Sequence, residues 1–146
     1  MKIFAGSDHA GFELKQRLCA LARELGHEVM DLGPESAERV DYPDFGGAVG
    51  RAVAAEPGSR GLLCCGSGIG IMIAANKVPG IRAATAWDET SARLCRQHND
   101  ANVLSIGERL VAAARAEEML RIFLATDFEG GRHAGRVAKI DALLEA

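Results

Sequence analysis

The sequence lacks an excess of basic residues, an apolar run long enough to cross a membrane, and a signal-peptide pattern at its start. Its 146 residues include 17 Lys and Arg against 20 Asp and Glu, a formal net charge of −3. Nucleic-acid-binding and membrane-surface proteins usually carry a basic excess, and a membrane-spanning helix needs about 20 apolar residues. We therefore expect a cytoplasmic protein whose partners include neither nucleic acid nor membrane.

Cysteine is also scarce, and no two cysteines form a CxxC pair. The four cysteines are Cys19, Cys64, Cys65 and Cys95. Without paired spacing, a zinc site or a thioredoxin-like redox motif is not expected, and a chain of this length folds without a metal or disulfide staple. Neighbouring Cys64 and Cys65 face opposite sides of a strand, which disfavours a bond between them. We expect four free thiols, three of them in the core, and no metal or cofactor.

The sequence does contain a regular alternation of short apolar runs and helical patterns. The predicted strands are residues 2–6, 29–32, 61–65, 81–86 and 102–106, and the predicted helices are residues 11–25, 44–55, 68–76, 89–98, 111–125 and 132–144. This alternation indicates βαβ units and a parallel sheet, and nearly continuous apolar strands indicate helices on both faces. The predicted fold is α/β: a Rossmann-like, doubly wound five-stranded parallel sheet in a three-layer α/β/α sandwich. It forms a single domain over residues 1–146 with a C-terminal helix.

Ligands of such sheets bind beyond the carboxyl ends of the strands, where four segments of this sequence are expected. These segments are residues 7–9, 66–70, 87–88 and 107–109. Asp8 and His9 follow the first strand, either as site residues or as a cap of the next helix. Arg109 is a cationic candidate, and Trp87, the only tryptophan, either lines the site or packs against its neighbours.

A glycine-rich turn follows the third strand, in the order Gly66, Ser67, Gly68, Ile69 and Gly70. Its glycines allow a sharp turn whose N–H groups point outward at a helix N-terminus, where an anion is favoured. The dinucleotide pattern GxGxxG fails because an isoleucine, Ile71, stands at the third glycine, and a Walker pattern is absent. The turn is expected to hold a small anion rather than a dinucleotide; the alternative is a tight connection without a ligand.

Cys65 stands directly before this turn. A helix N-terminus favours the thiolate form of a cysteine, and a thiolate serves as a nucleophile or a general base. The alternative is a buried structural cysteine, which is the role expected of Cys64. Ser67 within the turn either caps the helix or relays a proton.

Further polar candidates come from other parts of the chain. His98 ends a helix, and its expected place beside the cleft makes it a candidate acid or base; the alternative is a favourable charge at a helix C-terminus. Arg132 and Arg136 are four residues apart, so they share a helix face and can hold one phosphate, unless that face is simply solvated. His133 lies off this face and is expected to be structural. Tyr42, the only tyrosine, is a site candidate or a packing residue.

Five segments together resemble the type B ribose-5-phosphate isomerases, within a sugar-phosphate isomerase family that also contains the galactose-6-phosphate isomerase subunits. In order, the segments are GSDHAGFELK, DYPDF, CGSGIGIMIAANKVPGIRAA, SARLCRQHNDANVLSIGER and FEGGRHAGRV. The resemblance runs from about residue 2 to residue 140 without a gap. It implies a homodimer or homotetramer with active sites at subunit interfaces and no metal or nucleotide cofactor. It also implies interconversion of aldose and ketose phosphates through a cis-enediolate.

The resemblance implies roles for individual residues as well. Cys65 corresponds to the base that moves a proton between carbons 1 and 2, in a family whose other branch carries a Glu at the position of Ile71. Ser67 corresponds to a residue that moves a proton between the two oxygens, and the amides of residues 66–70 to an anion hole for the enediolate. His98 corresponds to a residue suggested for opening the sugar ring. The matches that contact the sugar or its phosphate are Asp8, His9, Tyr42, His98, Asn99, Arg109, Arg132 and Arg136.

We therefore expect an isomerase of ribose 5-phosphate and ribulose 5-phosphate. One alternative is an isomerase of a six-carbon aldose phosphate, such as allose 6-phosphate or galactose 6-phosphate, because the sequence does not display the length of the pocket. The other is a non-catalytic sugar-phosphate-binding module. The presence of Cys65, Ser67 and His98 together speaks against this second alternative.

Overall fold

The structure is a computed structural model that describes residues 1–144. It contains one sheet with the strand order β2-β1-β3-β5-β4. The strands are β1 (Lys2–Ser7), β2 (Glu28–Asp31), β3 (Arg60–Cys65), β4 (Ala83–Thr85) and β5 (Val103–Gly107). The helices of the described residues are α1 (Phe12–Glu24), α2 (Tyr42–Ala55), α3 (Ile69–Ala75), α4 (Glu89–Gln97), α5 (Ala113–Ala125) and α6 (Arg132–Ala142). Each neighbouring pair of strands is parallel, which confirms the predicted sheet. The last two residues of the predicted 1–146 domain lie outside the described residues.

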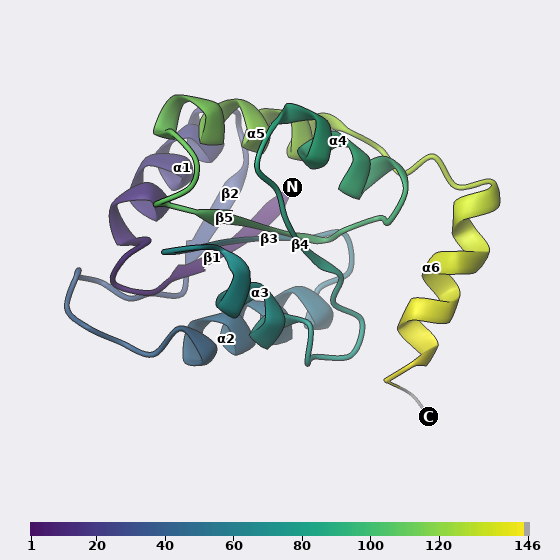
Figure 1. Ribbon diagram of the computed structural model, residues 1–146, viewed down its shortest axis with the longest axis horizontal. Coiled ribbons are helices and arrows are strands. Elements are labelled where there is room, and N and C mark those ends of the chain that lie inside the picture. Colours follow the sequence, from purple (N-terminus) through teal and green to yellow (C-terminus); the bar gives the residue numbers. More distant parts are fainter. Residues whose placement is uncertain (145–146) are drawn as a thin grey trace.

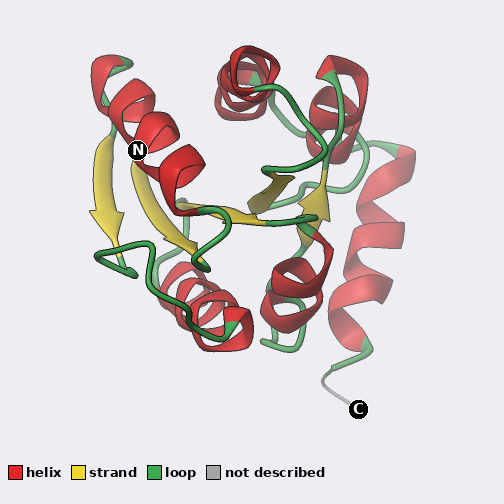
Figure 2. Cartoon of the chain, turned by 60° about the vertical axis from the view of Figure 1, so that its left-hand side comes forward, coloured by secondary structure: helices red, strands yellow, loops and turns green. Residues whose placement is uncertain are grey.

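Helices cover both faces of the sheet (Figure 1). On one face, α1, α4 and α5 bury apolar side chains that include Leu18, Cys95 and Phe123. On the other face, α2 and α3 bury Val49 and Ile71. Figure 2 shows the strands lying between these two helical layers. The arrangement is the predicted three-layer α/β/α sandwich, and none of the described helices has the length and apolar character that crossing a membrane requires.

Some elements begin or end at other residues than predicted. β2 is largely exposed rather than covered on both faces, because it is an edge strand that pairs only with β1. β4 is shorter than the predicted strand and pairs with β5 only over Ala83–Thr85. α2 begins at Tyr42, before its predicted start, because Pro43 fits the first turn of a helix. α6 ends at Ala142 rather than at Leu144.

The sheet has a carboxyl edge and an amino edge with different residues on them. All strands run in one direction and the helices return the chain, so residues that follow a helix lie at the amino edge. Asn102, directly before β5, accepts a hydrogen bond from the N–H of Gly61 near the start of β3. Cys65 ends the same strand, about 13 Å further at roughly 3.3 Å per residue. His98, which ends α4 just before Asn102, therefore lies at the amino edge.

Helix α6 stands apart from the rest of the molecule, on the side of α4 (Figure 1). Near the end of α6, Arg82 Nη1 donates hydrogen bonds to both carboxylate oxygens of Asp141, each at 2.9 Å. A cavity of ≈ 440 Å³ separates α6 from the body and is lined mainly by apolar side chains, among them Ile81 and Ile140. The ion pair thus holds the end of a helix whose largest apolar side chain, Ile140, is 43% exposed.

Candidate functional site

The glycine-rich turn lies at the carboxyl edge, between β3 and α3. Gly68 has a φ of 77°, in the left-handed region that glycine adopts without strain. A Cβ at this position would lie 2.8 Å from the nitrogen of Gly107, so the turn and the end of β5 approach closely. The Gly68 carbonyl accepts hydrogen bonds from the hydroxyls of Thr85 (2.9 Å) and Ser105 (2.6 Å). Side chains of β4 and β5 therefore hold the turn in place.

The side chain of Cys65 faces this turn. Its Sγ accepts a hydrogen bond from the Gly68 N–H at 3.1 Å, and the residue is 4% exposed. An N–H group aimed at the sulfur stabilises negative charge on that atom. Ser67 Oγ accepts the Ile69 N–H at 3.2 Å, a local contact within the turn. The N-cap of α3 is Gly68 and no side chain caps this helix, so the cap alternative for Ser67 is wrong. The turn thus donates one N–H to the Cys65 sulfur and another to the Ser67 hydroxyl.

The other three cysteines lie in the apolar core as free thiols, as predicted. Burial raises the pKa of Cys19 and Cys95 to about 11. Burial also raises the pKa of Cys64 well above its usual value. Cys64 packs on the opposite face of β3 from Cys65, because neighbouring side chains of a strand alternate. These three thiols are inert packing residues.

Two residues after β1 lie at the same edge as the turn. Asp8 is 7% exposed, and its Oδ1 accepts the N–H of Gly11 at 2.9 Å, just before α1. This contact closes the turn before α1. Because the N-cap of α1 is Gly11 and no side chain caps this helix, the alternative role of Asp8 as a helix cap is wrong. His9 Nδ1 accepts the N–H of Val40 at 3.3 Å, which ties β1 to the loop before α2.

Tyr42 and Arg109 contact the glycines of the turn directly. A Cβ added to Gly70 would lie 2.6 Å from the Tyr42 ring, and one added to Gly66 would lie 3.0 Å from Arg109 Nη1. Side chains larger than glycine at these two positions would displace both contacts. Trp87, by contrast, is 53% exposed, so it is not a core residue of its own chain.

The remaining candidates lie at the opposite edge of the sheet. The sequence interpretation placed His98 beside the cleft, and within one chain this is wrong, because α4 carries it back to the amino edge. Asn99 follows His98 and lines the cavity under α6. Arg132 and Arg136 are both exposed and belong to α6, which lies at this edge as well. The predicted site residues therefore form two separate groups.

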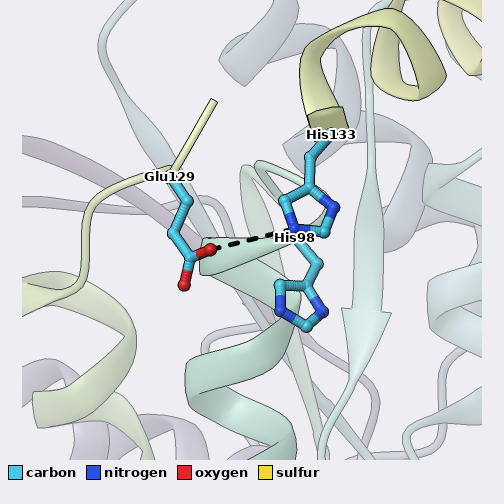
Figure 3. Close-up of side chains that lie close together, drawn as sticks. All are labelled: His98, Glu129 and His133. Atoms are coloured by element: carbon cyan, nitrogen blue, oxygen red, sulfur yellow. Dashed lines mark ion pairs between the residues drawn. The ribbon is translucent and has the colours of Figure 1, made fainter. Parts of the chain in front are cut away.

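A histidine pair joins α4 to α6 at the amino edge (Figure 3). The rings of His98 and His133 are stacked, with centroids 4.3 Å apart and planes 16° apart. Glu129 Oε2 lies 3.8 Å from His133 Nε2. Burial, followed by the nearby charge of Arg132, lowers the pKa of His133. The sequence interpretation left His133 as a structural residue, and no local pattern indicates a contact between two separate helices.

Three ligand atoms of this cluster, from His98, Glu129 and His133, lie within 4.8 Å of one another. A metal ion bound by histidine lies in the plane of the imidazole ring, along the nitrogen lone pair. Two stacked rings with nearly parallel planes cannot both point at one ion. The cluster is therefore arranged as an aromatic stack and not as a metal-binding set.

Each group of residues offers a different part of a chemical reaction. The carboxyl edge combines a thiol with main-chain donors, a set that can remove a proton beside a carbonyl and stabilise the resulting anion. The amino edge combines two arginines with an imidazole, a set that can hold a phosphate and transfer a proton. Since the two edges are about one strand length apart, one chain does not bring both groups together.

The chain is similar to proteins of known name over nearly its whole length. The model of the Ribose/Galactose Isomerase family matches residues 3–140. Ribose-5-phosphate isomerase B of Escherichia coli is 47% identical over 142 residues, which cover 97% of this chain and 95% of that protein. The Mycobacterium tuberculosis enzyme of the same name is 41% identical over 146 residues, covering 99% of this chain and 89% of that protein.

Solved structures show the same fold. Ribose-5-phosphate isomerase B of Clostridium thermocellum superposes with a TM-score of 0.96 at 49% identity, covering 99% of this chain and 98% of that chain. The Mycoplasma genitalium protein of the same name, with bound ribulose-5-phosphate, gives a TM-score of 0.95 at 39% identity. That alignment covers 99% of this chain and 96% of the other.

Proposed function

The chain belongs to the ribose/galactose isomerase family, and from this premise we propose that it interconverts ribose 5-phosphate and ribulose 5-phosphate. The observation that carries the proposal is the orientation of Cys65, whose sulfur accepts the Gly68 N–H in the glycine-rich turn. The choice of substrate is supported by the names of the relatives and by the ribulose-5-phosphate bound to the Mycoplasma genitalium protein.

In the proposed reaction, the Cys65 thiolate is the general base. It takes the proton from C2 of the open aldose, and negative charge develops on the carbonyl oxygen as a cis-enediolate forms. The thiol then returns the proton to C1, which gives the ketose, while Ser67 carries a proton between the two oxygens. The amides of the turn stabilise the enediolate, and each such donor contributes about 3 kcal/mol.

The arginine pair of α6 holds the phosphate at the far end of the substrate. Arg132 and Arg136 are one helical turn apart on α6, a spacing that suits one phosphate group. Binding energy from this remote group orients the reacting carbons against Cys65. His98 and Asp8 open the sugar ring by moving a proton to and from its oxygens. Further contacts to the sugar and phosphate come from His9, Tyr42, Asn99 and Arg109.

The complete site is proposed to form between two copies of the chain. Within one copy, the carboxyl-edge group and the amino-edge group lie at opposite ends of β3, about 13 Å apart along the strand. A sugar phosphate must contact both groups at once. A homodimer, alone or paired into a tetramer, brings the carboxyl edge of one copy to the amino edge of the other.

Cys65 rather than a carboxylate is proposed as the base because of the residue at position 71. Ile71 is fully buried in the core on the α2–α3 face of the sheet and cannot accept a proton. Cys65 is the thiol on that same face.

The test replaces the two neighbouring thiols one at a time. Cys65→Ala removes the base, so turnover and exchange of the C2 proton with solvent should fall by roughly 100- to 10 000-fold, while ribose 5-phosphate still binds. Cys64→Ala removes the neighbouring inert thiol and should keep the wild-type kcat. Rates and calorimetric binding are measured for both variants. Turnover that persists in Cys65→Ala would remove Cys65 as the base.

A comparison of substrates tests the five-carbon assignment separately. We expect kcat/KM to be higher for ribose 5-phosphate than for allose 6-phosphate. A preference for the six-carbon sugar above about 10-fold would move the assignment to a six-carbon isomerase, because one extra carbon in a pocket changes kcat/KM by such a factor. Binding of both sugars without turnover of either would indicate a non-catalytic module.

A further inference from the structure

His133 is a buried side chain for which the proposed reaction has no use. It is 6% exposed, and its Nε2 lies in the interior without a hydrogen-bond partner among the described residues. A buried polar atom usually has a partner, and an exception calls for an explanation. The main contact of the His133 ring is a stack with the ring of His98, whose centroid lies 4.3 Å away.

The stack restrains a side chain that would otherwise rotate freely. His98 is the last-turn residue of α4, where its backbone N–H bonds to the Leu94 carbonyl and the chain then turns toward β5. A half-buried histidine at a helix end can adopt several rotamers. Stacking against a buried ring, with the two planes 16° apart, restrains the plane of the His98 imidazole. Figure 3 shows the two rings next to each other.

Neighbouring charges determine the state of His133. Burial, then the charges of Arg132 and His98, lower its pKa; Glu129 opposes them, and Arg136 lowers the pKa further by a smaller amount. The ring is therefore neutral at physiological pH, and it adds no positive charge against His98.

We infer that His133 is a positioning residue that holds the imidazole of His98 in the orientation needed to transfer a proton to the sugar ring. This inference rests on the proposed function, in which His98 opens the ring. Helix α6 carries both His133 and the phosphate-binding arginines, so one element sets the distance between the phosphate and the proton-transfer group. The end of α6 is held at the same edge by the ion pair between Asp141 and Arg82.

The experiment compares three variants of the full chain. His133→Ala removes the stack, and misplacement of His98 should lower kcat roughly 10- to 100-fold with KM changed less than about threefold. His133→Phe keeps an aromatic ring in the stack and should retain kcat within about threefold of wild type. Val137→Ala removes buried apolar atoms from the same helix but leaves the histidine stack in place, and should leave kcat unchanged.

A measurement without substrate distinguishes positioning from a general effect on folding. In imidazole NMR spectra, the His98 ring protons should move downfield in His133→Ala, because the ring current of His133 is lost, and remain near their wild-type positions in His133→Phe. Equal losses of kcat in His133→Ala and Val137→Ala, or unchanged His98 signals in His133→Ala, would overturn the inference. If wild type isomerises no sugar phosphate, the proposed function fails, while the NMR comparison still decides whether His133 orients His98.

Discussion

At the scale of single residues, Gly68 combines two constraints that only glycine meets. Its φ is 77°, and a Cβ would lie 2.8 Å from the Gly107 nitrogen. Gly80 has a similar φ of 86° but has open space where its Cβ would be. Comparing Gly68 with Gly80 therefore separates the free-energy cost of a left-handed backbone from the free-energy cost of a steric clash.

Replacing each of these glycines by alanine gives the first prediction. Gly80→Ala should lower the free energy of unfolding by about 1–2 kcal/mol and leave kcat unchanged, since only the left-handed conformation is penalised. Gly68→Ala should lower the free energy of unfolding further and also reduce kcat. The turn must shift away from β5, and the N–H at position 68 moves with the turn. Denaturant unfolding and steady-state rates measure both effects. Equal destabilisation by the two substitutions, with kcat preserved, would contradict this description of the turn.

Protonation of His133 should make stability depend on pH. Its pKa is lowered in the folded protein by burial, then by Arg132, His98 and Arg136, with Glu129 opposing them. The unfolded chain, with a pKa near 6.5, therefore takes up this proton at a higher pH than the folded chain does. The free energy of unfolding should fall as pH decreases below about 6.5 and stop falling, for this group, once folded His133 is also protonated.

Comparison with His133→Phe isolates this contribution from those of other groups. The variant keeps the stack but does not titrate, so its stability should fall less between about pH 8 and about pH 5 than that of wild type. Denaturant unfolding at fixed protein concentration measures the difference. The same slope in both proteins would show that His133 does not titrate differently on folding.

At the scale of elements, helix α6 carries several residues of the proposed site but makes few contacts with the rest of the molecule. It carries Arg132, His133 and Arg136, and it is tied to the body by the His98 stack and by the Asp141–Arg82 ion pair. Without Asp141, Arg82 would keep its 3.4 Å ion pair with Asp100 and lose only the contact that reaches α6.

Asp141→Asn should therefore loosen α6 as a unit. We expect KM for ribose 5-phosphate to rise roughly threefold to tenfold, with a decrease in kcat. The reason is that the proposed phosphate-binding arginines of α6 and His133, which stacks on His98, move together with the helix. Lys139→Gln, a change at an exposed residue of the same helix, serves as the control and should behave as wild type. Kinetic constants like those of wild type in Asp141→Asn would mean that the ion pair has no part in placing the helix.

The elements themselves were largely predictable, because their signals are local. The stripe of leucines in α1, the glycine-rich turn before α3 and the spacing of Arg132 and Arg136 each depend on a few neighbouring residues. The edge on which His98 lies depends instead on the direction of α4, and its contact with His133 depends on where α6 packs. Neither can be read from spacing along the chain, so sequence reasoning did not recognise that His98 lies at the amino edge of its own chain, and it missed the stack.

At the scale of the whole molecule, the direction of the chain separates the two halves of the proposed site. Every strand points to one edge, where Cys65 and the glycine-rich turn lie, and α4 and α6 bring the histidines and arginines to the other edge. A twofold dimer contains each contact between its copies twice. If the carboxyl edge of one copy meets the amino edge of the other, the reverse contact is therefore also made. Each dimer would then hold two complete sites.

Subunit complementation is the measurement that tests this claim most directly. Cys65→Ala and Arg136→Ala each disable a different half of the site, so each variant alone should have little activity. When the two variants are unfolded, mixed in equal amounts and refolded, half of the dimers are mixed and each mixed dimer has one intact site, which predicts about a quarter of the wild-type activity. A mixture no more active than its separate components would contradict a site shared between two copies of the chain.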